Sequence, residues 1–408
     1  MKTKILFALT LSIFASACDD GDNAVPEKTS LLTLTVDASY ATDIADHWII
    51  VHDEDGSLLA SESFEANQEL EIVTDKPAPG KITVTHLRHF VTNDSKFYFA
   101  TSHLGIEKGK HMTLKLNSGM KPAATGKLNV SVSNVASHDH HSLSSQISSA
   151  GGASWSGGTG ILDMESTTFR DISKHIVTVS DGNSLRHKVL NDVKPNDLYS
   201  FSFYDMDPFD QTADFSFPQP DEVLLDVWGS EPNTTLTPNN YNLIAHFNSD
   251  THTTIKAGYL NSLTNYRTRL DILYPDYAYE YINIGSIPNG NNAWPQKSDF
   301  NISEKSFTNF SATSSKSYVW RLSRWGYTDA ASQTVITWDV SASTGNQSIR
   351  EWPSEITSVH PTLSFDNMKH GSTTFYTQSP PFESVVNTNF EAGPEPEGLR
   401  LGIRVITH

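Results

Sequence analysis

The sequence predicts an all-β protein built of tandem antiparallel β-sandwich domains, and three observations predict it. Apolar and polar residues alternate over strand-length segments, as at 32–36 and 128–132. This period of two places one set of side chains on each face of a strand. Turn residues recur about every ten residues, which is typical of short antiparallel strands. Helical periodicity is sustained nowhere, and short helical turns are expected only near 261–267.

Residues 30–118 are expected to form the first sandwich. Asp55-Gly56 is a strong hairpin signal, because a tight hairpin turn needs residues that accept a positive φ. The segment "PAPGK" at 77–81 supplies another turn. This spacing is that of a β-sandwich of roughly 90 residues. The strand candidates lie at 32–36, 48–51, 82–87, 97–100 and 112–116.

A second β domain is expected at 125–235, after a linker at 117–127. Its segment 142–160 is rich in Gly and Ser, and we expect a long loop there because it is too polar for a core. Residues 175–190 repeat the pattern of 47–64, which is a His, an apolar strand, an acidic Gly turn and Ser-Leu. This similarity indicates either a weak internal repeat or convergent hairpin chemistry.

The third domain is expected at 241–408. Its last segment, 399–406, alternates cleanly, with Leu401, Ile403 and Val405 on one face and arginines on the other. Such a pattern predicts a strand with one buried face.

The N-terminus has the features of an export signal. Lys2 and Lys4 precede an apolar run at 5–14 and three small residues at 15–17. This order is that of a secretory signal, and the run is too short to span a bilayer. Cys18, the only cysteine of the chain, follows directly. The arrangement resembles the bacterial lipoprotein signal, which implies that 1–17 are removed and Cys18 is acylated. The alternative is an ordinary signal peptide followed by a chance cysteine.

Residues 18–29 are expected to form an acidic tether, because Asp19, Asp20 and Asp22 follow the cysteine. This patch resembles the export signal of surface lipoproteins in Bacteroidetes-type bacteria. The resemblance implies a protein anchored in the outer membrane and facing outward. The alternative is a tether whose charges only keep it extended. Each buried acyl methylene contributes ~0.8 kcal/mol, so several acyl chains make a durable anchor.

Charge limits the partners of the chain. The formal net charge is -18, and it becomes -20 when Lys2 and Lys4 are removed with residues 1–17. A strongly acidic surface disfavours nucleic acid and anionic membrane surfaces, so the expected contact with the membrane is the acyl anchor alone. Without another cysteine there is no disulfide, and the core alone must stabilise the fold.

The first domain resembles a known family. The segments "WIIVHDEDGSLL" and "PAPGKITVTHL" follow the order strand, acidic turn, strand, Pro-Gly-Lys turn, strand. Together with the lipidated N-terminus, they resemble the N-terminal domain of fimbrillin-like proteins over residues 18 to 135. Polymerising members are cleaved by an arginine-specific protease near the first strand, whereas the first arginine here is Arg88. The resemblance therefore implies an anchor or a standalone surface protein. Tandem β domains on a lipid tether also resemble glycan-binding lipoproteins of polysaccharide-uptake systems.

Two segments carry groups that could bind a metal, and no other cofactor is expected. In "SHDHHS", an extended chain places His138 and His140 on one face, which suits zinc. In "YDMDPFD", Asp205 and Asp207, with Asp210, offer hard oxygen ligands for calcium. The alternatives are a solvated loop in the first segment and a polar turn in the second.

The C-terminal aromatic residues are the candidate ligand-binding groups. Trp294, Trp325 and Trp352 stand among turn residues, and exposed tryptophans there could stack on sugar rings. The alternative is that they close the ends of a sandwich. By contrast, Trp320 and Trp338 alternate with apolar neighbours and are expected in the core.

The sequence supports three hypotheses about function. The first is a non-catalytic surface adhesion or binding protein, similar to a fimbrial anchor, with an edge strand or groove that accepts a strand of a protein partner. The second is a glycan-binding accessory lipoprotein. The third is a hydrolase with a carboxylate pair, although the chain has no G-x-S-x-G, H-E-x-x-H or Walker motif.

Overall fold

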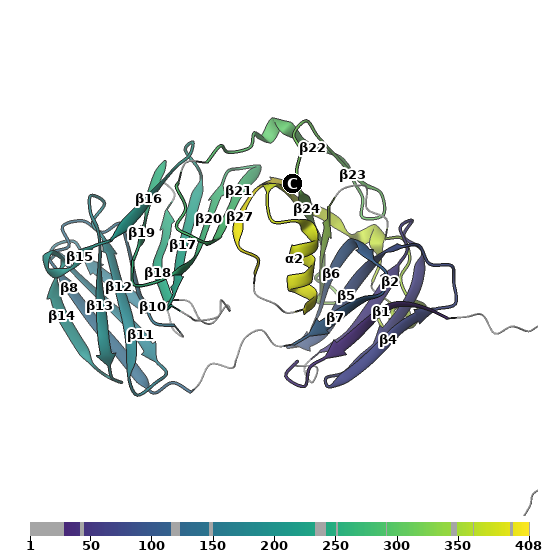
Figure 1. The fold of residues 1–408 in the computed structure, drawn as a ribbon, viewed down its shortest axis with the longest axis horizontal. Helices are drawn as coiled ribbons and strands as arrows, with labels where there is room; N and C mark the ends of the chain where they lie inside the picture. The colour runs from purple at the N-terminus through teal and green to yellow at the C-terminus, as the bar shows by residue number, and fades with distance from the viewer. Residues whose placement is uncertain are drawn as a thin grey trace, which may run out of the picture.

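The computed structural model describes residues 28–40, 45–115, 123–146, 150–232, 242–249, 252–290, 292–343, 349–361, 363–391 and 395–407. The chain is all-β and mostly antiparallel, as the alternating pattern predicts (Figure 1). The expected signal peptide, Cys18 and nearly all of the acidic tether lie outside the described residues.

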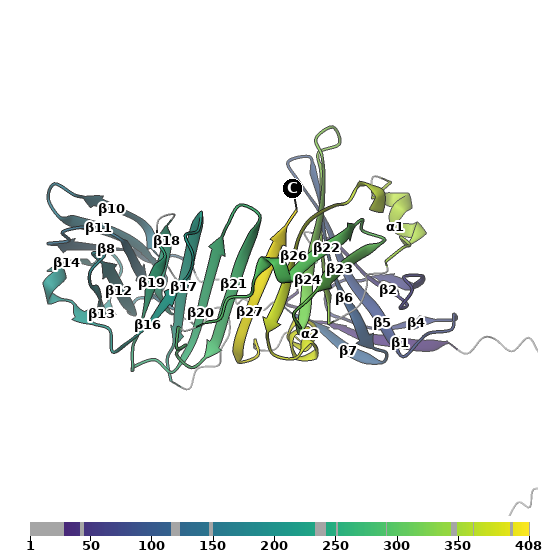
Figure 2. The same cartoon turned by 90° about the horizontal axis from the view of Figure 1, so that it is seen from above.

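The largest element of the described structure is a sheet of twelve strands, which follow one another along the long axis of the molecule (Figure 2). All of its neighbouring strands are antiparallel except β25 and β6, which are parallel. In spatial order the strands are β18 (Asn242–Ser249), β17 (Glu222–Ser230), β20 (Asn265–Leu273), β21 (Tyr277–Gly285), β27 (Gly398–Ile406), β26 (Lys369–Gln378), β24 (Trp320–Asp329), β25 (Thr334–Ala342), β6 (Ser95–Glu107), β5 (Lys81–Thr92), β2 (Asp46–His52) and β3 (Leu58–Ser63).

This sheet joins parts of the chain that the sequence assigns to different domains. Strands from 46–107 and from 222–406 hydrogen-bond into one ladder through the pair β6–β25. The boundaries expected near 118 and 241 therefore do not coincide with the edges of the sheet. The alternation at 399–406 does form a strand, β27, in which Leu401, Ile403 and Val405 are buried as expected.

A three-stranded sheet packs against one end of the large sheet. It contains β4 (Gln68–Thr74), β1 (Thr29–Val36) and β7 (Lys110–Leu114), in that order. Alternate residues of β1, including Leu34 and Val36, bury their side chains against Ile49 and Val51 of β2. The expected Asp55-Gly56 hairpin between β2 and β3 is present, and Gly56 has φ +92°.

Two four-stranded sheets form a sandwich at the opposite end. The first has the order β10 (Ala150–Ser156), β11 (Ile161–Thr168), β8 (Gly126–Ser133) and β14 (Leu198–Ser202). The second has the order β15 (Asp207–Pro208), β13 (Leu185–Val193), β12 (Ser173–Ser180) and β9 (His140–Ser144). Their core contains Leu128, Val130 and Val132 from β8 and Val177 and Val179 from β12.

The Gly/Ser-rich segment 142–160 is not one long loop, which corrects the sequence prediction. It contributes most of β9 and all of β10. Ser142 Oγ donates a 2.9 Å hydrogen bond to the carbonyl of Ile244 in β18, and Ser144 bonds the carbonyl of Leu243. The polar side chains are buried because a neighbouring strand satisfies their hydroxyls.

Smaller elements complete the fold. Two further antiparallel pairs are β16 (Gln211–Ser216) with β19 (Thr254–Tyr259), and β22 (Phe300–Lys305) with β23 (Phe310–Ser314). The 3-10 helices are η1 (Phe203–Asp205), η2 (Lys297–Asp299) and η3 (Phe365–Asn367), and the α-helices are α1 (Ser354–Val359) and α2 (Phe382–Glu391).

The position of the helices corrects another expectation. Residues 265–267 belong to β20, so the helical turns expected near 261–267 are not helices. The helix α2 instead buries Val386 and Phe390 against the three-stranded sheet. Those two residues are four apart, which is the helical spacing, but the pattern lasts only for the ten residues of this helix. Among the described residues, no helix has the length and apolar character needed to span a membrane.

Candidate functional site

Trp325 lies in the core, which corrects the expectation that it is exposed. Its side chain has 0% exposure and packs edge-on against Phe307 and Phe310 at ring distances of 5.3 and 5.1 Å. Its indole N–H donates to the carbonyl of Lys305. A fully buried indole offers no face to a ligand, so Trp325 contributes to stability instead. Trp320 and Trp338 are buried, as the alternation predicts.

Trp294 and Trp352 are half-buried and belong to two different cores. Trp294 packs against Tyr279 at 5.0 Å, and its N–H donates 2.9 Å to the carbonyl of Ser216. Trp352 packs against Phe365 and Trp338 at 4.9 and 5.0 Å. The three tryptophans therefore pack in two separate clusters, which favours the alternative that they close the ends of the β layers.

The histidines of "SHDHHS" pair differently from the prediction. His138 Nε2 lies 2.9 Å from His141 Nδ1, whereas His140 is buried and bonds Asp139 at 3.1 Å. The other carboxylate oxygen of Asp139 lies 3.1 Å from His252 Nε2. Burial alone would raise the pKa of Asp139, but these imidazoles lower it. His138 and His140 therefore do not converge on one metal ion.

The acidic segment "YDMDPFD" serves local structure. Asp205 accepts a 3.1 Å hydrogen bond from the backbone N–H of Ser202 and completes a capping box for η1. Asp207 pairs through its backbone with His187 across β15 and β13. Asp210 accepts a 2.7 Å bond from the backbone N–H of Asn261. Asp205 and Asp210 thus accept hydrogen bonds from separate backbone groups, which agrees with the alternative that this segment is a polar turn.

Several backbone groups of the edge strand β3 already form hydrogen bonds with side chains. The N–H of Leu58 donates a 3.0 Å hydrogen bond to the Glu351 carboxylate, and the carbonyl of Leu58 accepts a 2.6 Å hydrogen bond from Lys76. The carbonyl of Leu59 accepts a 3.0 Å bond from Thr74. A foreign strand would have to displace these side chains in order to pair with β3, which disfavours strand addition at this edge.

An open hollow of about 620 Å³ lies on the outward face of the sheet β10-β11-β8-β14. We call it the polar hollow. Side chains along a strand point alternately to its two faces, so one set faces the core and the other faces the hollow. In β8, Val130 is buried whereas Asn129 and Ser131 are partly exposed. The hollow is lined by Asn129, Val130, Ser131, Gly152, Ala153, Ser154, Asp163, Met164, Glu165, Leu198, Tyr199 and Ser200.

The register of the four strands arranges the polar hollow in two parallel rows. One row runs across the sheet as Ser154, Asp163, Ser131 and Ser200. The next row runs as Gly152, Glu165, Asn129 and Leu198. Since neighbouring strands are about 4.8 Å apart, each row is roughly 14 Å long. The two carboxylates therefore lie side by side on β11, between hydroxyl and amide groups.

Charge and apolar surface differ along the polar hollow. Glu165 forms a 2.8 Å ion pair with Lys127 at the rim, and both side chains are exposed enough for this pair to contribute little stability. Leu198 is 78% exposed at one end of its row. Burial raises the pKa of the neighbouring Tyr199, and Asp197 raises it further, so this phenol stays neutral. The hollow thus combines hydrogen-bonding groups with apolar surface, to which the exposed Leu198 contributes.

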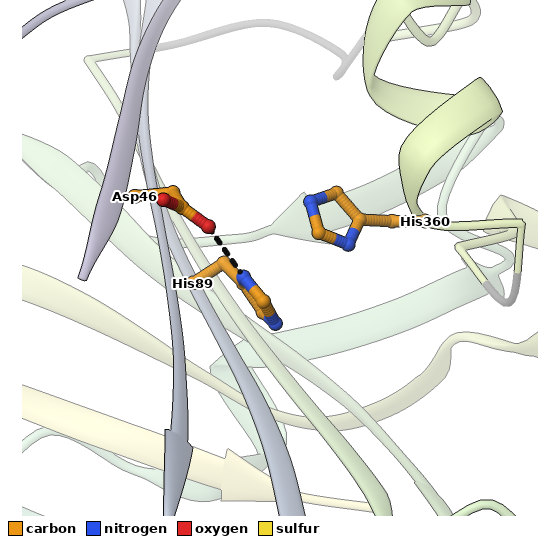
Figure 3. Close-up of side chains that lie close together, drawn as sticks. All are labelled: Asp46, His89 and His360. Atoms are coloured by element: carbon orange, nitrogen blue, oxygen red, sulfur yellow. Dashed lines mark hydrogen bonds and ion pairs between the residues drawn. The ribbon is translucent and has the colours of Figure 1, made fainter.

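The structure also brings together Asp46, His89 and His360, a cluster that the sequence does not predict. Figure 3 shows these three side chains converging, with His360 approaching from the segment that follows α1. One ligand atom from each side chain lies within 4.8 Å of the others. Among the described residues, this is the one group of three or more His, Cys, Asp and Glu side chains that meets that criterion. Burial, with the charge of His89, lowers the pKa of His360 to about 4.

No sequence signal could have joined these three residues, because 43 and 271 positions separate them along the chain. The same holds for the polar hollow, whose strands are brought together by register. Comparison with known protein families gives no match for this chain, and no curated protein sequence matches it.

Proposed function

We propose that this chain is a lipid-anchored, outward-facing, non-catalytic binding protein that holds a neutral polyhydroxylated ligand, a glycan, in the polar hollow. The observation that supports this most is the pair of rows across β10, β11, β8 and β14, in which hydroxyl, carboxylate and amide side chains share one open face. A surface adhesion protein and a glycan-binding accessory protein would both use such a face.

The chemistry of the rows suits sugar hydroxyls. Asp163 and Glu165 accept hydrogen bonds, Asn129 both donates and accepts, and the serine hydroxyls do either. Exposed Leu198 can contact the C–H face of a sugar ring. The two carboxylates, in a chain of net charge -18, oppose an anionic ligand. The ligand is therefore a neutral glycan rather than an anionic one.

The membrane location rests on the sequence. Lys2, the apolar run at 5–14 and Cys18 support export and acylation, and Asp19 and Asp20 support a position on the outer surface. A glycan-binding face held on a tether at the outer membrane would meet polysaccharides outside the cell.

A glycan array tests the ligand class. The chain from residue 28 onward is applied as wild type and as the double variant Asp163→Asn/Glu165→Gln. The matched control is Glu69→Gln/Glu71→Gln, which makes the same charge change at two exposed positions, also two apart, on β4. We expect neutral glycans to bind the wild type and the control, and the hollow variant to lose at least tenfold in affinity. Equal binding by all three chains would refute the polar hollow as the site.

Membrane fractionation tests the anchor. Cys18→Ala in the full-length chain should move the protein from the membrane to the soluble fraction, since the acyl chains are the expected membrane contact. A Cys18→Ala protein that stays with the membrane would contradict the lipoprotein assignment.

A further inference from the structure

Three neighbouring strands align Asp46, His89 and Tyr98 in one row. Asp46 on β2 pairs in register with His89 on β5, and His89 pairs with Tyr98 on β6. Asp46 Oδ2 and His89 Nδ1 are 3.0 Å apart. The His89 ring stacks on Tyr98 at 4.6 Å. The row therefore holds the carboxylate and the first imidazole on a rigid sheet.

His360 completes the cluster from outside the sheet. It caps the C-terminal end of α1, and its ring lies 4.3 Å from the His89 ring, measured between centroids. Its Nδ1 is 3.0 Å from the hydroxyl of Tyr98. In Figure 3 its other nitrogen faces Asp46 and His89. This is the arrangement in which one ring nitrogen is held by a polar partner and the other is free to bind.

Two buried nitrogens in this cluster have no hydrogen-bond partner among the described residues. They are Nε2 of His89 and Nε2 of His360, and the two residues are 8% and 6% exposed. A buried polar atom without a partner destabilises a protein by about 1–3 kcal/mol, so such atoms are rare. The orphaned Nε2 of His360 faces Asp46 and His89, and it calls for a ligand there, whereas His89 would bind that ligand through Nδ1, the nitrogen that already approaches the Asp46 carboxylate.

We propose that Asp46, His89 and His360 bind one Zn²⁺ ion, with at least one coordination position left to water. Two imidazoles and one carboxylate form a donor set that Zn²⁺ accepts, and zinc sites with three protein ligands keep an open fourth position. This inference is independent of the proposed function, because the polar hollow lies on a different sheet.

Only a small adjustment is needed to close the site. The ligand atoms lie within 4.8 Å of one another, whereas bonds of about 2.1 Å in a tetrahedron place ligand atoms about 3.4 Å apart. The Asp46 side chain is 66% exposed and can rotate toward the ion. Its exposure also gives the ion a path from solvent.

The segment that carries His360 is already fixed to the sheet. His52 Nε2 bonds the carbonyl of Glu351 at 2.8 Å, and the Glu355 carboxylate accepts a bond from Ser61. The Trp48 ring lies edge-on to His360 at 5.6 Å. The zinc ligands are therefore held near their positions by contacts that do not involve the ion, which reduces the entropy lost on binding.

Calorimetric titration with ZnCl₂ tests the proposal on the chelator-treated, full-length chain carrying Cys18→Ala and no affinity tag. We expect one ion per chain for this parent. Asp46→Ala and His360→Gln should each weaken binding at least tenfold. Asp46 is exposed, so its replacement leaves the folding of the chain intact. Tyr98→Phe should weaken binding roughly tenfold, as loss of a partner that orients a ligand does.

The matched control is His138→Gln/His141→Gln, which removes another close histidine pair. It should leave the zinc affinity unchanged. Zinc should also raise the melting temperature of the parent and the control, but not that of His360→Gln, because binding to the native state alone stabilises it. A parent that binds no zinc, or zinc binding lost in the control but kept in Asp46→Ala, would overturn the proposal.

Discussion

The indole N–H of Trp338 donates a 2.7 Å hydrogen bond to the hydroxyl of Ser102, 236 residues away in the sequence. Both residues have 0% exposure. They join β25 to β6, the one parallel pair of the twelve-stranded sheet. This contact connects the part of the sheet before residue 107 with the part after residue 222. The hydroxyl of Thr85 lies 2.7 Å from that of Ser102 and extends the network to β5.

Replacing Ser102 by Ala should lower the free energy of unfolding by about 1–3 kcal/mol, because it leaves a buried indole N–H without an acceptor. Urea denaturation measures the change. Ser102→Ala, Trp338→Phe and the double variant together form the cycle that isolates the hydrogen bond. If the single serine variant is as stable as the wild type, the bond is not a significant part of this junction.

The partly buried pair of Glu280 and Arg404 should contribute more stability than exposed ion pairs do. Arg404 Nε donates a 2.7 Å hydrogen bond to one carboxylate oxygen of Glu280, and the Tyr376 hydroxyl donates a 2.8 Å hydrogen bond to the other. Glu280→Ala leaves Arg404 without its partner, and loss of one member of a buried pair costs roughly 3–5 kcal/mol. We expect the lower end, because the Arg404 side chain is 31% exposed.

The control for this pair is Glu107→Ala. Glu107 lies 3.8 Å from Lys81, and both side chains are more than half exposed. Its loss should cost between 0 and about 1 kcal/mol. Equal effects of the two substitutions in thermal or urea unfolding would contradict the role given to Glu280.

His103 should make the fold sensitive to acid. Burial lowers its pKa to about 4, while an unfolded histidine has a pKa of about 6.5. Between these values the unfolded chain binds a proton that the folded chain does not. The free energy of unfolding should therefore fall as the pH falls through this window, by up to ~1.4 kcal/mol per pH unit from this residue, and should not depend on it above the window.

The measurement is the urea midpoint of wild type and His103→Asn from pH 7 to pH 4. Asn keeps a polar group near Ser341, whose hydroxyl lies 2.7 Å from His103 Nδ1. The slope should be flatter in this variant and unchanged in His111→Asn, because His111 is exposed on β7. Identical slopes for wild type and His103→Asn would exclude His103 as a source of acid sensitivity.

Gly290 should not tolerate a side chain. It has φ +74°, and a Cβ there would lie 2.2 Å from the carbonyl oxygen of Asp214 in β16. Backbone atoms cannot rotate away, so Gly290→Ala should cost at least 1–3 kcal/mol, about the energy of a strained backbone site. Gly80→Ala is the control, because a Cβ at Gly80 meets nothing within 4 Å. Thermal unfolding of the two variants shows whether this close approach is essential.

The sequence was sufficient to predict those strands and turns whose residue pattern lies within one short segment. The alternation of Leu401, Ile403 and Val405 predicted β27 and its buried face, and Asp55-Gly56 predicted a hairpin. The sequence was insufficient where a distant segment supplies the partner. Ser142 and its neighbours were expected to lie in a loop because nothing nearby shows that β18 accepts their hydrogen bonds.

The candidate sites depend even more on distant contacts. Trp325 stands among turn residues in the sequence, yet Phe307 and Phe310 enclose it. Asp163 and Ser131 become neighbours only through the register of β11 and β8. Polar residues that point outward from a strand have no local pattern that separates a ligand site from an ordinary surface, and the order of strands in a sheet is not written in any one segment.

Affinity electrophoresis tests the central claim most directly. The wild type, Asp163→Asn/Glu165→Gln and Glu69→Gln/Glu71→Gln are run through native gels with and without neutral polysaccharides that the array identifies. The account predicts that the polysaccharide retards the wild type and the β4 control equally and does not retard the hollow variant. Retardation of all three chains to the same extent, or of none of them with any neutral polysaccharide, would contradict the claim that the face of β10, β11, β8 and β14 binds glycan.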